Sequence, residues 1–138
     1  MQIDPAEEPG RPKFSLKITV KPEDIDEMNH VNNIVYLRWA QQVAAAHWNR
    51  LITSEMQSKY QWVALRHEID YLSPAFLGDE LVGQTWVNAM DGVKSIRHVE
   101  FYRGEKCLAK AITHWCLLDA STLKPKRIGQ DIKVLFGV

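Results

Sequence analysis

The sequence predicts an α+β fold in which one long helix packs against an antiparallel sheet. A run without proline or glycine, over residues 33–51, has apolar side chains at helical spacing. Four strand-like runs follow it, joined largely by tight turns, of which Asp91-Gly92 is the strongest hairpin signal. Hairpin-connected strands are antiparallel, so one helix would lie against one sheet.

Length and composition indicate one globular domain. The chain has 138 residues, of which 46% are hydrophobic and 25% charged, which is ordinary for a soluble protein. We expect residues 13–138 to form that domain and residues 1–12, which are polar and contain three prolines, to be a frayed tail. The 17 basic residues balance the 17 acidic ones, so the chain has no overall excess of positive charge of the kind that binds nucleic acid.

The sequence indicates a soluble cytoplasmic protein. The first residues lack the basic start and apolar centre of a signal peptide, and no run approaches the roughly 18 apolar residues that span a membrane. Cys107 and Cys116 have no metal-ligand spacing, so we expect them to be reduced and buried. The histidines show no ligand spacing either, and we predict no metal and no cofactor.

The first half of the chain predicts a strand, a polar loop and the long helix. Alternating residues over 14–20 are typical of a half-buried strand, which Lys21-Pro22 ends. The helix over 33–51 would take its N-cap from Asn32 or Asn33. Because its residues are apolar around much of the circumference, we expect the sheet to wrap it and leave no surface face.

The second half predicts the sheet. Residues 53–59 suggest a short turn of helix, and strands are expected at about 62–72, 81–90, 94–102 and 107–118. In the first of these, strict alternation puts Val63, Leu65, His67, Ile69 and Tyr71 on one face. Residues 132–136 fit a short strand or a helix equally well. Uncovered strand edges favour pairing with a second subunit.

The polar loop between the first strand and the helix is the candidate reactive site. Asp24 and Asp26 lie two residues apart just before the predicted helix. An ordinary aspartate is ionised near pH 7 and needs no activation to attack a carbonyl or to deprotonate water. The helix N-terminus offers unpaired N–H groups that would polarise that carbonyl. On this evidence either aspartate is a candidate, and His30 would orient, donate or cap the loop.

Three stretches in sequence order resemble the hotdog-fold acyl-CoA thioesterases, close to the 4-hydroxybenzoyl-CoA thioesterase group. The first is Asp24-x-Asp26-x-x-Asn29-His30-Val31-Asn32-Asn33-x-x-Tyr36-Leu37-Arg38-Trp39. The second begins with Arg66-His67-Glu68-Ile69-Asp70-Tyr71-Leu72-x-Pro74-Ala75 and continues through Gly78-Asp79-Glu80-Leu81. The third is Ala111-x-Thr113-x-Trp115-x-Leu117-x-Asp119 followed by Lys124-Pro125-x-Arg127-Ile128.

The resemblance implies a curved antiparallel sheet wrapped around one long central helix. It implies a homodimer or homotetramer with the active site at the subunit interface and an acyl-CoA as substrate. It selects Asp26 over Asp24 as the catalytic carboxylate, assigns the carbonyl-polarising N–H to Asn33 or its neighbour, and adds His30 to the site. Tyr36 and His67, from the first two stretches, are assigned to substrate binding.

The sequence departs from the family pattern at three positions. Asn29 replaces the usual glycine before the histidine; Gln42, beside Gln41, replaces a glutamate of many relatives, and Ala44 replaces an arginine. The leading hypothesis is hydrolysis of an acyl-CoA to a free acid and coenzyme A. Alternatives are a thioesterase for acyl carrier protein and a non-catalytic acyl-CoA-binding module, which the two glutamines motivate.

Overall fold

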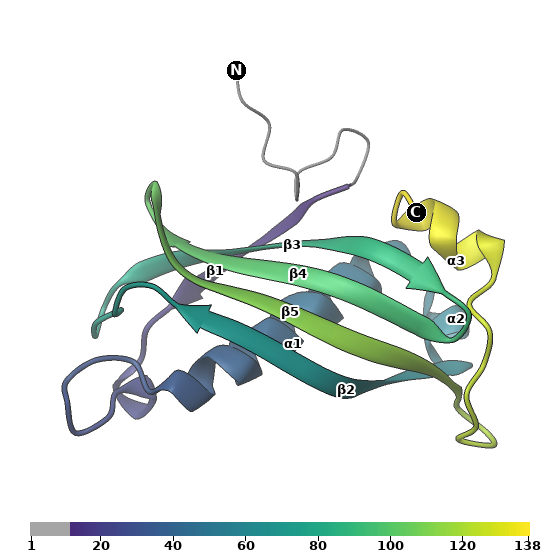
Figure 1. Cartoon of the computed structure of the whole chain (residues 1–138), viewed down its shortest axis with the longest axis horizontal. Helices are drawn as coiled ribbons and strands as arrows, with labels where there is room; N and C mark the ends of the chain where they lie inside the picture. The colour runs from purple at the N-terminus through teal and green to yellow at the C-terminus, as the bar shows by residue number, and fades with distance from the viewer. Residues whose placement is uncertain (1–11) are drawn as a thin grey trace.

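The structure is a computed structural model that describes residues 12–138; all of the expected tail but Pro12 lies outside that range. Figure 1 shows the elements in their spatial arrangement. In chain order they are β1 (Phe14–Thr19), a short 3-10 helix η1 (Pro22–Asp24), α1 (Asn33–Leu51), α2 (Ser54–Gln57), β2 (Tyr60–Tyr71), β3 (Glu80–Asp91), β4 (Lys94–Arg103), β5 (Lys106–Asp119) and α3 (Gln130–Leu135).

The five strands form one antiparallel sheet in the order β1-β3-β4-β5-β2. The sheet curves over α1, which lies along one of its faces (Figure 1). The predicted fold, a curved antiparallel sheet around one long helix, is confirmed. Residues 12–138 contain no helix long and apolar enough to cross a membrane.

One face of α1 forms the core, and the opposite face lies outside it. Val43 and Trp39 are buried against the sheet, together with Phe101 of β4. Gln42 and Ala45 are exposed, and Ile34 at the first turn is 71% exposed. The expectation that the sheet would wrap the helix on all sides is therefore wrong for a single chain, because one curved sheet covers only one face.

The alternation predicted for β2 is interrupted by a bulge. The register with β5 shifts between Ala64 and Arg66, so residues before and after this point no longer keep a simple period of two. Trp62 packs edge-on against Trp48 of α1, and Ile69 packs on the same core side. Val63 and Leu65 are 40% and 53% exposed, so the expectation that they share a face with Ile69 is wrong.

The C-terminal segment forms the helix α3, which settles the strand-or-helix alternative for residues 132–136. Phe136 follows α3, is fully buried, and stacks on Trp48 at 6.0 Å between ring centroids. The segment therefore closes the end of the core that lies nearest the C-terminus of α1. Both cysteines are free, as predicted; Cys116 is buried, whereas Cys107 is only half-buried.

Gly83 of β3 lies close to α1, and a methyl group there should destabilise the protein. A Cβ at Gly83 would lie 2.8 Å from Val43 Cγ2, and a β-branched side chain in a helix has little rotamer freedom to move away. We expect Gly83→Ala to lower the free energy of unfolding by about 1–3 kcal/mol, measured by urea denaturation. In a Val43→Ala background the same change should cost much less; an equal cost in both backgrounds would show that this contact is not responsible.

Candidate functional site

The polar loop is held in a closed form before α1 begins. An isolated bridge pairs Ile25 with Val31 in antiparallel fashion and so closes the loop of residues 26–30. Asn29 has φ 65°, a left-handed conformation that asparagine tolerates better than most residues other than glycine. Asn29 therefore adopts a backbone conformation that glycine also favours, at the position where the family pattern has glycine.

Asp24 is a structural residue of this loop. Its side chain is 2% exposed, accepts a hydrogen bond from the Lys21 N–H at 2.9 Å, and pairs with Arg38 at 2.5 Å. Its carbonyl oxygen accepts from the Asn32 N–H at 2.9 Å. With both carboxylate oxygens hydrogen-bonded and the side chain buried, Asp24 joins the segment after β1 to α1 and is not accessible to a substrate.

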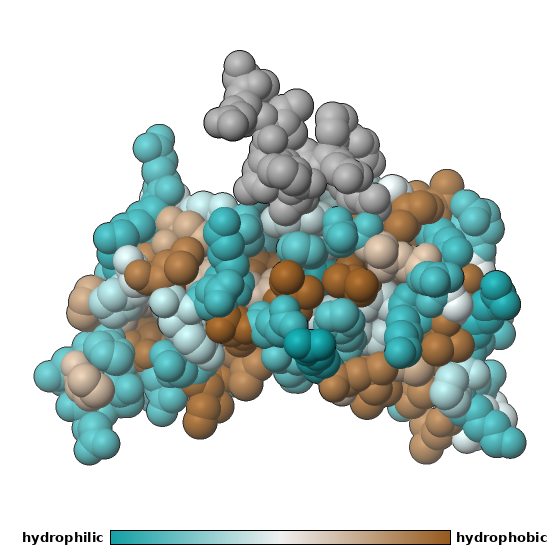
Figure 2. All heavy atoms as spheres, in the orientation of Figure 1, coloured by the Kyte–Doolittle hydropathy of each residue, from teal (hydrophilic) through white to brown (hydrophobic). Residues whose placement is uncertain are grey.

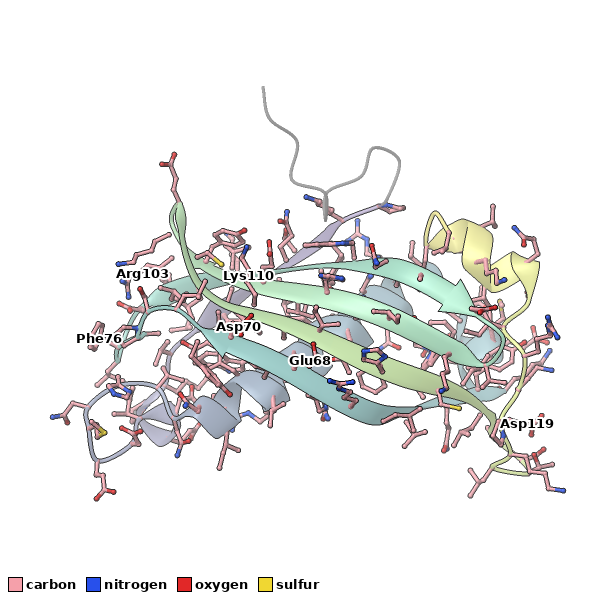
Figure 3. All side chains as sticks on the ribbon, viewed as in Figure 1. Glu68, Asp70, Phe76, Arg103, Lys110 and Asp119 are labelled. Carbon is pink, nitrogen blue, oxygen red and sulfur yellow. The ribbon has the colours of Figure 1, made fainter. Side chains whose placement is uncertain are left out.

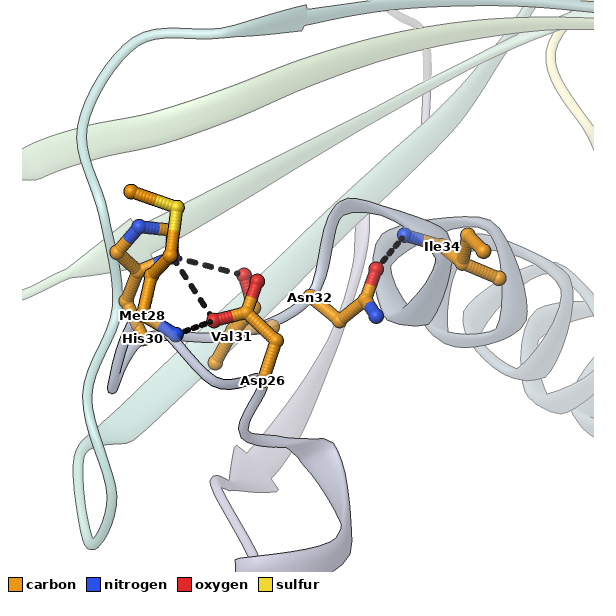
Figure 4. Close-up of polar contacts among 6 residues, drawn as sticks. All are labelled: Asp26, Met28, His30, Val31, Asn32 and Ile34. Atoms are coloured by element: carbon orange, nitrogen blue, oxygen red, sulfur yellow. Dashed lines mark hydrogen bonds and ion pairs between the residues drawn. The ribbon is translucent and has the colours of Figure 1, made fainter.

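Asp26 lies in the same loop, beside Met28 and His30 (Figure 4). Its side chain is 24% exposed, and its Oδ1 accepts from the Met28 N–H at 2.8 Å. His30 Nδ1 lies 3.9 Å from the same Oδ1, and the His30 carbonyl accepts from the Asp26 N–H at 3.0 Å. Asp26 and His30 are therefore neighbours, and Oδ2 of Asp26 has no hydrogen-bond partner among residues 12–138.

The start of α1 lies next along the chain. Asn32 is the N-cap and accepts from the Ile34 N–H at 3.1 Å through its side chain, which confirms one of the two predicted caps. Asn33 is the first helical residue, and its N–H donates to no group in the described part of the chain. The first turn contains no acidic side chain. An unpaired N–H in the positive field of a helix N-terminus is suited to bind a developing oxyanion.

Tyr71 joins this region from β2 and was not among the predicted site residues. Its hydroxyl donates to the Asn33 carbonyl at 3.0 Å, and its ring lies 5.6 Å from that of Tyr36. Burial raises the pKa of Tyr71 above its ordinary value, so the phenol remains neutral at neutral pH. The sequence signal was its position in the second family-like stretch, four residues after His67.

The two residues predicted to contact substrate lie in different surroundings. Tyr36 is 2% exposed, and its hydroxyl has no hydrogen-bond partner among the described residues. Burial raises its pKa to about 12. His67 is half-buried on β2 and shares a hydrogen bond of 2.9 Å with Thr113 of β5; burial lowers its pKa. No described hydrogen bond joins His67 to the loop. Asp26 and His30 are neighbours in the loop, and Asn33 follows it as the first residue of α1.

Apolar side chains surround the loop on the surface. Met28 and Ile34 are each 71% exposed, and the segment after β2 adds Leu72, Phe76 and Leu77, at 54%, 45% and 58%. That segment touches the site, because the Val31 N–H donates to the Ala75 carbonyl at 2.8 Å. Figure 2 shows brown apolar patches along the lower border of the view, the side on which β2 lies. Exposed apolar surface of this extent marks an interaction surface.

Several charged side chains of the described residues lie on the outer face of the sheet. Figure 3 shows Glu68, Asp70 and Lys110 on the face of the sheet turned away from α1. On that face Lys110 pairs with Glu100 at 3.6 Å. No group of three or more His, Cys, Asp or Glu side chains in the described chain is arranged to hold a metal ion.

The family comparison agrees with this fold and with the three sequence stretches. Residues 20–136 match the family described as the thioesterase-like superfamily. The chain therefore belongs to the thioesterase-like superfamily, and membership of this family supports the hydrolysis of a thioester. A comparison with curated protein sequences finds no match.

Solved structures with the same fold include several thioesterases. A probable thioesterase of Bartonella henselae is 20% identical over 85% of this chain and 98% of its own, with a TM-score of 0.74. A 1,4-dihydroxy-2-naphthoyl-CoA thioesterase of Synechocystis is 17% identical over 91% and 96%, with a TM-score of 0.78. A hypothetical protein of Staphylococcus aureus, solved in complex with CoA, is 16% identical over 91% and 82%, with a TM-score of 0.79. At these identities the likeness shows the fold.

The two loop aspartates should respond differently to the same substitution. Asp24→Asn replaces a buried charge that faces Arg38, so we expect it to lower the free energy of unfolding by about 1–3 kcal/mol. Asp26→Asn keeps an acceptor for the Met28 N–H and should change it by less than about 0.5 kcal/mol. Urea denaturation of both variants tests this, and equal losses would contradict the structural role given to Asp24.

Proposed function

We propose that this protein hydrolyses an acyl-CoA thioester to a free acid and coenzyme A. The observation that carries the proposal is the accessible Asp26 carboxylate in the loop that leads directly into the unpaired N–H at the start of α1. A nucleophile or base next to an oxyanion donor is the minimum that acyl transfer needs. Family membership supports the reaction class.

The proposed reaction assigns one task to each group. The thioester carbonyl oxygen accepts a hydrogen bond from the Asn33 N–H, which stabilises the negative charge that forms on attack. Asp26 either attacks the carbonyl carbon itself or takes a proton from the attacking water. The carbon–sulfur bond then breaks and the thiolate of coenzyme A leaves and is protonated. If Asp26 forms an anhydride, a second attack by water releases the acid and restores the carboxylate.

His30 is assigned a supporting task. It lies 3.9 Å from Asp26 Oδ1 and 3.4 Å from the Val31 carbonyl, close enough to orient a water or the carbonyl group. Tyr36 and His67 remain proposed substrate contacts. The buried position of Tyr36 in the first turn of α1 supports a role in lining the acyl site, whereas His67 would contact substrate only from a second subunit.

Coenzyme A is the proposed carrier. The Synechocystis structure with this fold is named for a CoA thioester, and the Staphylococcus aureus structure was solved in complex with CoA. A thioesterase for acyl carrier protein is the alternative within hydrolases. Comparing hydrolysis of matched acyl-CoA and acyl-carrier substrates separates the two. Tight acyl-CoA binding without turnover would instead favour the binding module suggested by Gln41 and Gln42.

A second copy of this chain is the proposed partner, in a homodimer or homotetramer. β2 is an edge strand of the sheet, and the exposed apolar residues 72, 76 and 77 follow it directly. Pairing of two β2 edges would continue the sheet and cover this surface. It would also bring the second subunit towards the loop that holds Asp26.

Removing the Asp26 carboxylate should abolish most turnover. We expect Asp26→Asn to fold normally and to lower kcat by about a hundred- to ten-thousandfold on acyl-CoA substrates. His30→Ala should lose less, because it supports Asp26 and does not react. Free-thiol release with a panel of acyl-CoAs, varied in chain length and aromaticity, measures both. Near-wild-type rates for Asp26→Asn would refute the assignment, and a larger loss in His30→Ala would invert the two roles.

A charge on the β2 edge should separate the proposed subunits. Leu65 lies in β2 and is 53% exposed, so Leu65→Asp should leave the fold intact but repel its copy in a two-fold interface. We expect a halved mass by light scattering and a loss of turnover. Val134→Asp is the matched control, because Val134 is 65% exposed on α3, which is not part of the sheet. An unchanged mass for Leu65→Asp would exclude pairing through this edge.

A further inference from the structure

A buried arginine lies between the sheet and the C-terminal half of α1. Arg97 of β4 is 6% exposed. Its Nη1 donates to Thr85 Oγ1 at 3.1 Å and lies 2.8 Å from His47 Nδ1, while its guanidinium lies 5.7 Å from the centre of the Phe136 ring. Both hydrogen bonds use Nη1, and Nη2 and Nε have no acceptor among residues 12–138.

The charge of Arg97 has no negative partner within the described chain. No carboxylate of these residues forms an ion pair with its guanidinium. By contrast, Arg38, Arg66 and Arg103 each form an ion pair with a carboxylate. His47 does not compensate, because a nitrogen that accepts from a guanidinium must be unprotonated. Burial first, and then the charge of Arg97, lower the pKa of His47 to about 4, so this ring is neutral at neutral pH. Burying a charge without a counter-charge costs free energy, so such a group often has a function.

Arg97 lines a cavity whose other walls are almost entirely apolar. The cavity has a volume of about 290 Å³, close to the lower limit of roughly 300 Å³ for small-molecule sites. Trp48, Trp62, Met90 and Phe136 supply its apolar walls. Arg97 is the only charged side chain among the described residues that line it.

The cavity can be reached from the surface, because Gln41 and Ala45 among its lining residues are exposed on α1. The guanidinium of Arg97 thus borders an apolar space that opens along the exposed face of the helix.

We propose that this cavity binds an organic acid with an apolar body and that Arg97 receives its carboxylate. The aromatic walls would cover the apolar part, and the guanidinium would gain the counter-charge that the chain itself does not provide. The carboxylate has two sources: a free acid, or the far end of the acyl group of a thioester. Only the second source rests on the proposed function, since it requires a thioester substrate.

Calorimetric titration with octanoate tests the site, with 1-octanol as the uncharged control of equal length. We expect octanoate to bind the full chain at least tenfold more tightly than 1-octanol, because a charge-assisted hydrogen bond is worth about ten- to a hundredfold in affinity. Arg97→Gln should remove this preference. If octanoate binds no more tightly than 1-octanol to the unaltered protein, and no thioester shows the preference tested below, the proposal is wrong.

A second pair of variants keeps the test valid if Arg97→Gln fails to fold. Ala45→Phe places a ring at the exposed rim and should block the cavity, lowering octanoate affinity at least tenfold. Gln42→Phe is the matched control, since Gln42 is exposed on the same helix but does not line the cavity. Equal octanoate affinity in the two variants would place octanoate elsewhere and overturn the proposal.

The source of the carboxylate is resolved in an Asp26→Asn background, in which thioesters would bind without turnover. If the acyl group supplies it, 7-carboxyheptanoyl-CoA should bind at least tenfold more tightly than octanoyl-CoA, and adding Arg97→Gln should remove the difference. If a free acid supplies it, octanoate binds and the two thioesters bind equally. Octanoate binding requires no hydrolysis, so a failure of the proposed thioesterase activity would leave that result intact.

Discussion

The packing of α1 against the curved sheet is the constraint on which the rest of the structure depends. Val43 approaches β3 so closely that position 83 has room only for glycine. With the middle of the helix fixed there, its N-terminus lies beside the loop that carries Asp26, and its C-terminal half forms a wall of the cavity that holds Arg97. The same contact therefore sets the position of both chemically distinctive regions.

The fold was predictable because its signals are local. Helical spacing without proline or glycine marked residues 33–51, and Asp91-Gly92 marked a hairpin whose glycine has φ 62°. The bulge at Leu65 was not predictable, because it changes the register of β2 against β5 without altering the composition of the strand. The exposure of one face of α1 was missed for a related reason: hydrophobicity shows that a surface is buried, but not whether the same chain or a second copy buries it.

The candidate site was predictable in part. The sequence offered two candidate aspartates, and only the family resemblance distinguished them. The structure gives a physical reason to prefer Asp26, because both carboxylate oxygens of Asp24 are bonded to Lys21 and Arg38. The change from glycine to Asn29 is compatible with the loop conformation, because asparagine tolerates the left-handed backbone that glycine also adopts. Tyr71 was missed, since its contact with Asn33 joins residues 38 positions apart, and no local pattern reports such a pairing.

Arg97 and His47 show why buried polar groups escape sequence reasoning altogether. The alternation of the strand residues around Arg97 predicts only that its side chain faces one side of the sheet. Because most arginines are exposed, the sequence gives no sign that this one is buried. Its meaning arises from three elements that meet in space: β4 provides the charge, α1 the neutral imidazole, and the segment after α3 the ring of Phe136. The buried charge of Arg97 is hydrogen-bonded but has no counter-charge, and this follows from how the three elements pack together. The charge distinguishes the cavity from an ordinary packing defect, which would be lined by apolar atoms alone.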